Sequence, residues 1–229
     1  MKTKLTNSIV KKYGMDAGAN VVGVASSSDF GSAPHGFGPT DVLPECLSVI
    51  VLGVSFSPET LNDTAKYSTS RNTMLTSMTD IAKKVAKRIG VDGYKTKAIS
   101  AAGGKWIENN GRKEQFGYIS LKHAGEIAGL GVIGKNHLLT NPKYGNLLWL
   151  SAVLTDAELM PDEKIQFDIC ANCNKCVEAC PAEALCSIAF FGKRGCSKFF
   201  AIENKKFLVK CFLCRMVCPY GFGKYSDQL

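Results

Sequence analysis

Short β-branched runs alternate with helical periods along the first part of the chain. Three apolar runs predict strands, at 21–25, 47–54 and 147–154, and an alternating pattern predicts another at 94–99. Three stretches predict helices, at 5–17, 70–90 and 121–128, and the glycine-, serine- and proline-rich segment 26–44 predicts a connection. Strands mixed with long helices in this way predict an α/β (α+β) fold, in which helices cover a sheet.

The helix predicted for 70–90 has the clearest period. Its apolar residues recur mostly at steps of three and four, with Ser70 placed to cap the start and Gly90 to end the helix. The apolar stripe contains Met74 and Met78, and we interpret it as hydrophobic core rather than as a cofactor-binding surface.

Composition places the chain among ordinary globular proteins. It has 229 residues, of which 45% are hydrophobic and 21% charged, and this excludes the disordered and collagen-like classes. No stretch reaches the roughly 18 to 20 apolar residues of a membrane helix, and Lys11 and Lys12 interrupt any apolar leader. We therefore expect a cytoplasmic protein that does not engage a membrane.

Ten cysteines indicate metal or redox chemistry, because structural disulfides are rare in a reducing compartment. Nine of them lie between Cys170 and Cys218, so we predict two domains, 1–164 and 165–229. The second domain also carries a positive surplus, with eight Lys or Arg against two acidic residues over 193–229. This surplus fits a solvated surface, compensation for negative clusters, docking of an acidic electron donor, or nucleic-acid contact.

The first cysteine run has the spacing of bacterial ferredoxins. Cys170, Cys173, Cys176 and Cys180 precede Pro181 in the order C-x2-C-x2-C-x3-C-P, which binds [4Fe–4S] clusters. Three thiolates spaced in this way wrap three irons of one cube, whereas the fourth points away, starts a helix and serves the other cluster. Tetrahedral zinc instead takes two C-x2-C pairs.

The second run repeats only the last three members of this pattern. Cys211, Cys214 and Cys218 precede Pro219, and Leu208 stands where the first cysteine belongs. A cysteine from elsewhere must complete the set, either Cys196 in a basic loop or Cys186 on the helix expected after Cys180, and we favour Cys196. One predicted ligand set is then Cys170, Cys173, Cys176 and Cys218, and the other is Cys180, Cys196, Cys211 and Cys214.

The segment 129–134 matches G-x-G-x-x-G, the fingerprint of dinucleotide binding. That motif needs a strand before it and a helix after it. Here a helical stretch, 122–128, precedes the glycines and a strand-like stretch, 137–140, follows them. We therefore do not interpret the segment as a dinucleotide site; its glycines indicate a sharp turn or a close approach of the backbone to another group.

Taken together, these segments resemble one superfamily. The stretch from Lys122 through A-G-L-G-x-x-G-K-N at 128–136 and P-x-Y-G at 142–145, followed by both cysteine runs with Cys196, looks like the epoxyqueuosine reductases and reductive dehalogenases. The resemblance covers residues 45 to 222. It implies a nitroreductase-like, cobalamin-binding domain followed by a small bacterial-ferredoxin-like domain with two [4Fe–4S] clusters.

By this resemblance, the glycine segment and the strand after it line the corrin ring of cobalamin. The residues concerned are Gly129, Leu130, Gly131, Gly134, Lys135, Asn136, His137, Leu139 and Tyr144. The alternative is a glycine-rich turn in ordinary packing. The D-x-H-x-x-G ligand motif of other cobalamin proteins is incomplete, since Ala33 stands where the aspartate before His35 belongs, so we expect cobalt to lack a protein histidine.

Departures from the family leave the substrate open. The stretch 114–123 lacks the aspartate that donates a proton in epoxyqueuosine reductases, and we expect neither their helical extension for transfer RNA nor the twin-arginine signal of respiratory dehalogenases. Tyr118 lies in a dehalogenase-like segment and is our first choice for the proton donor, before Tyr67 and His123. For either tyrosine, the alternative is a buried side chain hydrogen-bonded to a backbone carbonyl.

The sequence therefore predicts a cobalamin-dependent iron–sulfur reductase. We expect a reduced flavodoxin- or ferredoxin-like donor to feed two clusters and then cobalt(I), with a small molecule as substrate and transfer RNA as a weaker expectation. One alternative is a ferredoxin-like electron-transfer or corrinoid-reducing protein without its own substrate. Another is a flavin-binding reductase on the same scaffold.

Overall fold

The computed structural model describes residues 2–109, 112–166, 168–185, 196, 200–203, 206–209 and 211–223. The chain divides into two compact units, each assembled from three segments of the sequence. Unit 1 comprises Met1–Val54, Leu75–Leu130 and Trp149–Ile165, and unit 2 comprises Ser55–Met74, Gly131–Leu148 and Gln166–Leu229. The last junction lies one residue from the boundary expected at 164/165, and the division into two continuous domains stays a prediction.

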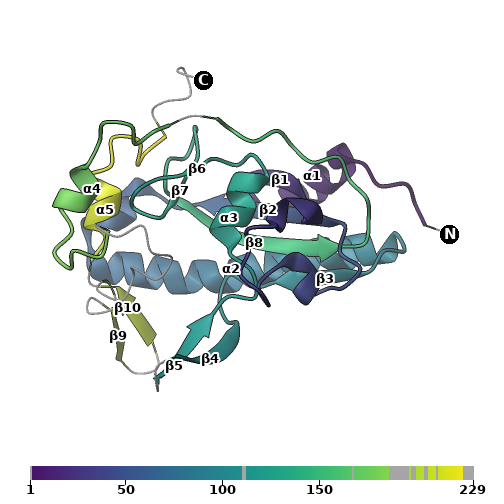
Figure 1. Ribbon diagram of the computed structural model, residues 1–229, viewed down its shortest axis with the longest axis horizontal. Coiled ribbons are helices and arrows are strands. Elements are labelled where there is room, and N and C mark those ends of the chain that lie inside the picture. Colours follow the sequence, from purple (N-terminus) through teal and green to yellow (C-terminus); the bar gives the residue numbers. More distant parts are fainter. Residues whose placement is uncertain are drawn as a thin grey trace. The chain divides into compact units, whose positions relative to one another are not determined.

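Unit 1 is built on a four-stranded sheet with the order β1-β2-β8-β3 (Figure 1). The strands are β1 (Val21–Ser26), β2 (Ser48–Ser55), β8 (Leu148–Thr155) and β3 (Thr96–Ile99). β1 pairs antiparallel with β2, and β3 pairs antiparallel with β8. All four strands predicted from the sequence are confirmed, with ends that differ by one or two residues.

Helices cover both faces of this sheet. On one face, α1 (Asn7–Asp16) and the Leu75–Val91 part of α2 (Thr64–Val91) pack their apolar residues against alternate strand residues. The buried cluster includes Val10, Val24, Ile50, Leu52, Met78, Ile81, Ala82, Val85, Ile89 and Val153. α3 (Leu121–Ile127) lies beside β1 on the other face, where a Cβ at Gly23 would stand 2.3 Å from the Ala128 carbonyl oxygen. The C-terminal end of α3 thus packs directly against the backbone of Gly23 in β1.

The methionine stripe of α2 belongs to the core, as expected, but the predicted start of this helix is wrong. α2 begins at Thr64, so Ser70 lies inside the helix. The Asp63 carboxylate accepts the N–H of Lys66 at 2.8 Å and so serves the first turn as a cap. Tyr67 in that turn is buried. Most of its neighbours in the sequence are polar, so the apolar periodicity does not reveal that the helix begins here. Within the described residues, none of the helices is both long and apolar enough to cross a bilayer.

The remaining elements are short. Three hairpins pair β4 (Lys105–Asn109) with β5 (Arg112–Phe116), β6 (Val132–Ile133) with β7 (Leu139–Thr140), and β9 (Phe200–Glu203) with β10 (Lys206–Val209). In unit 2, α4 (Lys175–Glu178) and α5 (Leu213–Met216) lie side by side (Figure 1). The predicted mixed α/β class is confirmed. The helix expected directly after Cys180 is not formed over 181–185, where Glu183 has a left-handed φ of 48° and the chain turns.

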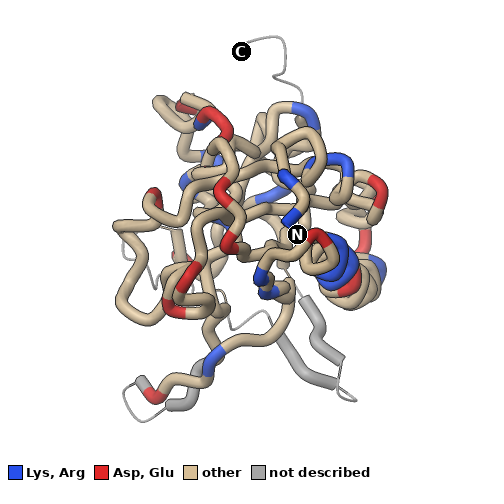
Figure 2. Tube along the Cα trace, turned by 90° about the vertical axis from the view of Figure 1, so that its right-hand side faces the viewer, with Lys and Arg blue, Asp and Glu red and all other residues tan. Residues whose placement is uncertain are grey.

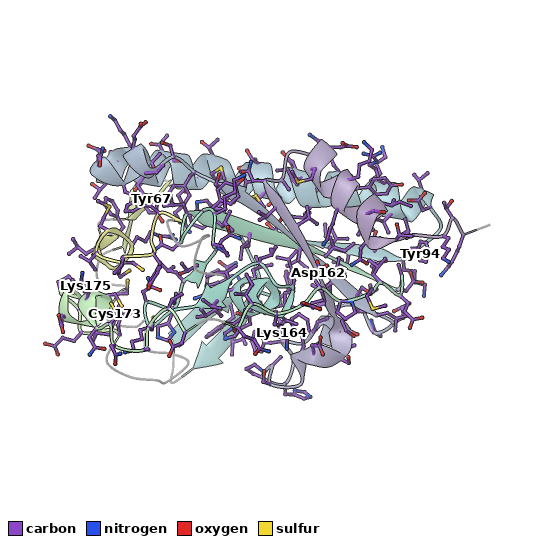
Figure 3. All side chains as sticks on the ribbon, turned by 90° about the horizontal axis from the view of Figure 1, so that it is seen from above. Tyr67, Tyr94, Asp162, Lys164, Cys173 and Lys175 are labelled. Atoms are coloured by element: carbon purple, nitrogen blue, oxygen red, sulfur yellow. The ribbon has the colours of Figure 1, made fainter. Side chains whose placement is uncertain are left out.

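Asp162 fastens the last segment of unit 1 to its first strand (Figure 3). Its carboxylate accepts the Lys11 ammonium at 2.8 Å and the backbone N–H of Val24 at 2.9 Å. Its own N–H donates to the Val24 carbonyl at 2.8 Å. Because β1 ends the order of the sheet, these bonds cover a strand edge that would otherwise present free backbone groups.

We expect Asp162→Ala to lower the free energy of unfolding by about 1 to 3 kcal/mol, because the N–H of the buried residue Val24 loses its acceptor. The matched control is Lys11→Ala, which removes only the partly exposed ion pair and should cost less than about 1 kcal/mol. Urea denaturation of both variants measures the difference. Equal small losses would show that the backbone contact is dispensable.

Candidate metal centre

Four cysteine side chains line one pocket of unit 2. They are Cys170, Cys173, Cys176 and Cys218, and the pocket is completed by Gly134, Lys135, Asn136, Ile169, Pro219 and Tyr220. The four come from both cysteine runs, as the crossed ferredoxin pattern requires. The structure thus brings together the first predicted ligand set, and its role in binding iron stays a prediction.

These thiols affect one another's ionisation. Burial raises the pKa of Cys176, and the nearby Cys170, Cys218 and Cys173 raise it further. Burial also raises the pKa of Cys218, against a hydrogen bond from the Tyr220 backbone that lowers it. Iron binds thiolates, so loading of this pocket with iron, if it occurs, should release protons and be favoured at higher pH.

Lys135 joins the glycine segment to the first cysteine loop. Its backbone N–H donates to Cys170 Sγ at 3.4 Å. Its ammonium donates to the Cys173 carbonyl at 3.0 Å and to Asn174 Oδ1 at 2.9 Å. Figure 3 labels Cys173, in this loop, and Lys175, the first residue of α4. Hydrogen bonds to cluster sulfurs are one way in which proteins set reduction potentials.

A second group of cysteines gathers around Cys214. Burial raises the pKa of Cys214 to about 11, Arg215 lowers it, and the nearby Cys196 and Cys211 raise it. Cys180 Sγ accepts the N–H of Ala184 at 3.4 Å, and its membership of this group stays a prediction. Cys186 lies outside the described residues, so the preference for Cys196 over Cys186 stays a prediction too.

The two groups adjoin where α4 meets α5. Cys176 of α4 is near enough to raise the pKa of Cys214 in α5. The buried Asn136 lines the first pocket, and its Nδ2 donates to the Cys214 carbonyl at 3.3 Å. The residues before the two helices, Asn174 and Phe212, have similar dihedrals, φ −124° and ψ 9° against φ −143° and ψ 25°. The second run therefore repeats the local conformation of the first, as its spacing predicts.

In the part of the chain that the structure describes, no three His, Cys, Asp or Glu side chains stand close enough to hold one metal ion. A cubane needs no such group, because each of its irons takes a single cysteine. Tetrahedral zinc, by contrast, draws thiolates to within about 2.3 Å of one centre.

Backbone atoms of the chain occupy the space beside two of the glycines predicted to face a corrin ring. Gly131 has φ 157°, and a Cβ there would stand 2.3 Å from the Thr140 carbonyl oxygen within unit 2. Gly129 has φ 69°, and its Cβ would stand 2.2 Å from the Glu163 carbonyl oxygen within unit 1. Both positions therefore need glycine for backbone packing, which is the alternative stated above.

The other predicted corrin residues divide between two environments. Gly134, Lys135 and Asn136 line the cysteine pocket. Leu130 and Leu139 are buried, and His137 has φ 57°. The Tyr144 ring lies 5.3 Å from the Lys143 ammonium. The contact of these residues with cobalamin stays a prediction.

The three candidate proton donors also differ in environment. Tyr67, in unit 2, is 4% exposed, and its ring centroid lies 5.8 Å from Phe56 and 5.3 Å from Phe212. Tyr118, in unit 1, is 40% exposed. His123 Nδ1 lies 2.6 Å from Ser120 Oγ, and burial lowers the pKa of His123, which favours its neutral imidazole. Their catalytic role stays a prediction.

Arg215, one of the eight basic residues of 193–229, is buried and does not lie on a basic surface. It is 9% exposed, its guanidinium donates to the Asn146 carbonyl, and it lies 5.5 Å from the Phe56 ring centroid and 6.0 Å from that of Tyr67. Aromatic faces and a carbonyl can accommodate a buried guanidinium. The other seven basic side chains of 193–229 lie outside what the structure describes. Over the rest of the chain, basic and acidic residues are mixed (Figure 2).

Curated proteins with similar sequences are epoxyqueuosine reductases. The enzyme of Bacillus subtilis is 32% identical over 120 residues, and that of Listeria monocytogenes is 33% identical over 119 residues. Each match covers 47% of this chain and 31% of the relative, so the chain matches about a third of the relatives' length. No protein-family model matches the chain.

Solved structures agree over most of the chain. Epoxyqueuosine reductase from Streptococcus thermophilus gives a TM-score of 0.63 at 18% identity, over 93% of this chain and 65% of that chain. A reductive dehalogenase described as B12-dependent gives 0.60 at 20% identity, over 87% of this chain and 26% of that chain. The chain has the fold of epoxyqueuosine reductases and reductive dehalogenases. The predicted resemblance is confirmed. The cysteine pocket lies within the part of the chain that shares this fold.

Proposed function

We propose that this protein is a cobalamin-dependent iron–sulfur reductase that carries two [4Fe–4S] clusters. The observation that carries the proposal is the convergence of Cys170, Cys173, Cys176 and Cys218 on one pocket. The group around Cys214 supports a second cluster. When bound, such clusters supply one-electron transfer at potentials that the surrounding protein sets. The relatives' names support the oxidoreductase class.

The residues present fit the first cluster. Four thiols face the pocket, and the N–H of Lys135 is aimed at one of their sulfurs. The Lys135 ammonium holds the carbonyl of Cys173, which keeps the loop in shape before metal arrives. Asn136 connects this pocket to the carbonyl of Cys214. The chain thus binds and orients two neighbouring redox centres, a short path for electrons from a flavodoxin- or ferredoxin-like donor.

Cobalamin enters the proposal from the relatives, one of which is described as B12-dependent. When bound, it supplies a cobalt centre whose chemistry is the cofactor's own. The glycine segment gives it no independent support, because carbonyls of the chain fill the space beside Gly129 and Gly131. A small molecule is the proposed substrate. One epoxyqueuosine reductase structure contains a modified tRNA stem loop, and transfer RNA is the weaker candidate here.

Anaerobic reconstitution with iron and sulfide should load about eight irons per chain. The loaded protein is then titrated with cobalamin, and separately with flavin mononucleotide, while absorbance is recorded. Saturable cobalamin binding supports the reductase. Binding of flavin alone supports a flavin reductase on this fold, and clusters with neither ligand support a ferredoxin-like carrier. Loading of fewer than two clusters contradicts the proposal.

A further inference from the structure

We propose that Arg215 sets the reduction potential of the cluster bound through Cys214, as a buried positive charge that the cluster itself neutralises. This inference rests on the proposed function, because it requires the second cluster. Arg215 follows Cys214 directly in the chain and belongs to the same helix, α5. It acts through the cluster as a positioning and tuning residue, without contact with a substrate.

The contacts of Arg215 are with neutral groups. Its guanidinium donates to the Asn146 carbonyl, lies 3.5 Å from Asn146 Oδ1, and faces the rings of Phe56 and Tyr67. Among the described residues, no Asp or Glu forms an ion pair with it. A cation with 9% exposure therefore has no carboxylate to balance it in this part of the chain.

The neighbouring amide adds to the same imbalance. Asn146 is 1% exposed, and its Nδ2 has no hydrogen-bond partner in the described part of the protein. The Arg215 guanidinium and the Asn146 amide are thus two neighbouring buried donors in unit 2, and no carboxylate of the described residues forms an ion pair with Arg215. Burying a charge is costly unless an opposite charge compensates it. The anion that the proposed function places here is the thiolate-bound cluster.

Arg215 directly follows Cys214 in α5, so its fixed charge belongs to the immediate surroundings of that proposed ligand. A [4Fe–4S] cluster with four thiolates is an anion, and reduction adds one more negative charge. A nearby fixed cation stabilises the reduced state more than the oxidised state. Arg215 should therefore raise the reduction potential of this cluster. Since the charge is buried, salt should screen the effect only weakly.

Lys135 offers a matched comparison at the other cluster. Its ammonium is bound to the Cys173 carbonyl and Asn174 Oδ1, but its side chain is exposed. Water and salt therefore screen its charge. The two cations differ in burial, so removing each should shift the potential of a different cluster by a different amount.

The test is a potentiometric titration of the reconstituted full-length protein, with each reduced cluster followed by electron paramagnetic resonance at low and high salt. Arg215→Met should shift one of the two potentials downward, equally at both salt concentrations. Arg215→Lys should retain most of the wild-type potential. Lys135→Met should shift the other potential less, and less again at high salt.

A second measurement separates tuning from a merely structural role. In the cluster-free protein Arg215 is an uncompensated buried charge, so Arg215→Met should leave the denaturation midpoint unchanged or raise it. If Arg215 has only a structural role, Arg215→Met should lower the denaturation midpoint and leave the reduction potentials of both clusters unchanged. If Arg215→Met does not fold, Arg215→Gln is compared with Arg215→Lys: a lower potential for Gln alone supports the inference, and equal potentials overturn it.

The outcomes also distinguish the inference from the proposed function. Wild-type protein that loads fewer than two clusters contradicts the proposed function, and the inference falls with it. Two clusters whose potentials do not respond to Arg215→Met leave the proposed function intact and refute the tuning role.

Discussion

Cys196→Ser should lose one of two clusters, so that iron falls from about eight to about four per chain after anaerobic reconstitution. The physical reason is the incomplete second run. Leu208, which occupies the place of its first cysteine, lies in β10 opposite Ala201 of β9. A cysteine from elsewhere must therefore complete the set, and the favoured candidate, Cys196, lies near Cys214.

Two controls accompany this variant. Cys46→Ser should keep both clusters, because Cys46 is buried in unit 1, its S–H donates to the Ser48 carbonyl, and burial raises the pKa of its thiol to about 11. Cys186→Ser should keep both as well. Iron and sulfide analysis decides the matter: loss with Cys186→Ser and retention with Cys196→Ser would show that the ligand assignment is wrong.

Gly131→Ala should destabilise the protein by about 3 kcal/mol, the combined scale of a strained backbone and an overpacked contact. The new Cβ would stand 2.3 Å from the carbonyl oxygen of Thr140, and that residue pairs with Val132 between β6 and β7. The nearest three atoms belong to the backbone of Thr140 and Asn141, so no flexible side chain can move away. Thermal melting of the cluster-free variant measures the loss.

Gly134→Ala is the matched control from the same segment. Its Cβ would meet Asn136 Oδ1 at 3.2 Å and Cys170 Sγ at 3.4 Å, so the free energy of unfolding should change by less than about 1 kcal/mol. Cobalamin titration beside the melting curves then tests the cofactor interpretation. A stable Gly131→Ala protein would refute the packing account. Lost cobalamin binding by a stable Gly134→Ala protein would support a corrin site there.

The sequence predicts well what depends on local pattern. β-branched runs predict the strands of the sheet, and thiol spacing predicts which cysteines share the pocket. It predicts poorly what depends on distant partners. Arg215 has the composition of a surface residue and is buried because Phe56, Tyr67 and Asn146 surround it. The hairpin of β4 and β5 carries charged residues on both strands, so it offers no apolar alternation to detect.

The three-segment construction of unit 2 has a consequence for biosynthesis. The cysteine pocket needs Gly134, Lys135 and Asn136 as well as residues from Ile169 to Tyr220. Residues 55–74 join the same unit, so its contacts close loops across the segments 75–130 and 149–165. Such non-local closure is slow and costs chain entropy. On a ribosome the pocket cannot form until Cys218 has emerged, and a fragment that begins at residue 165 would lack Lys135 and its hydrogen bonds to the Cys173 carbonyl and to Asn174.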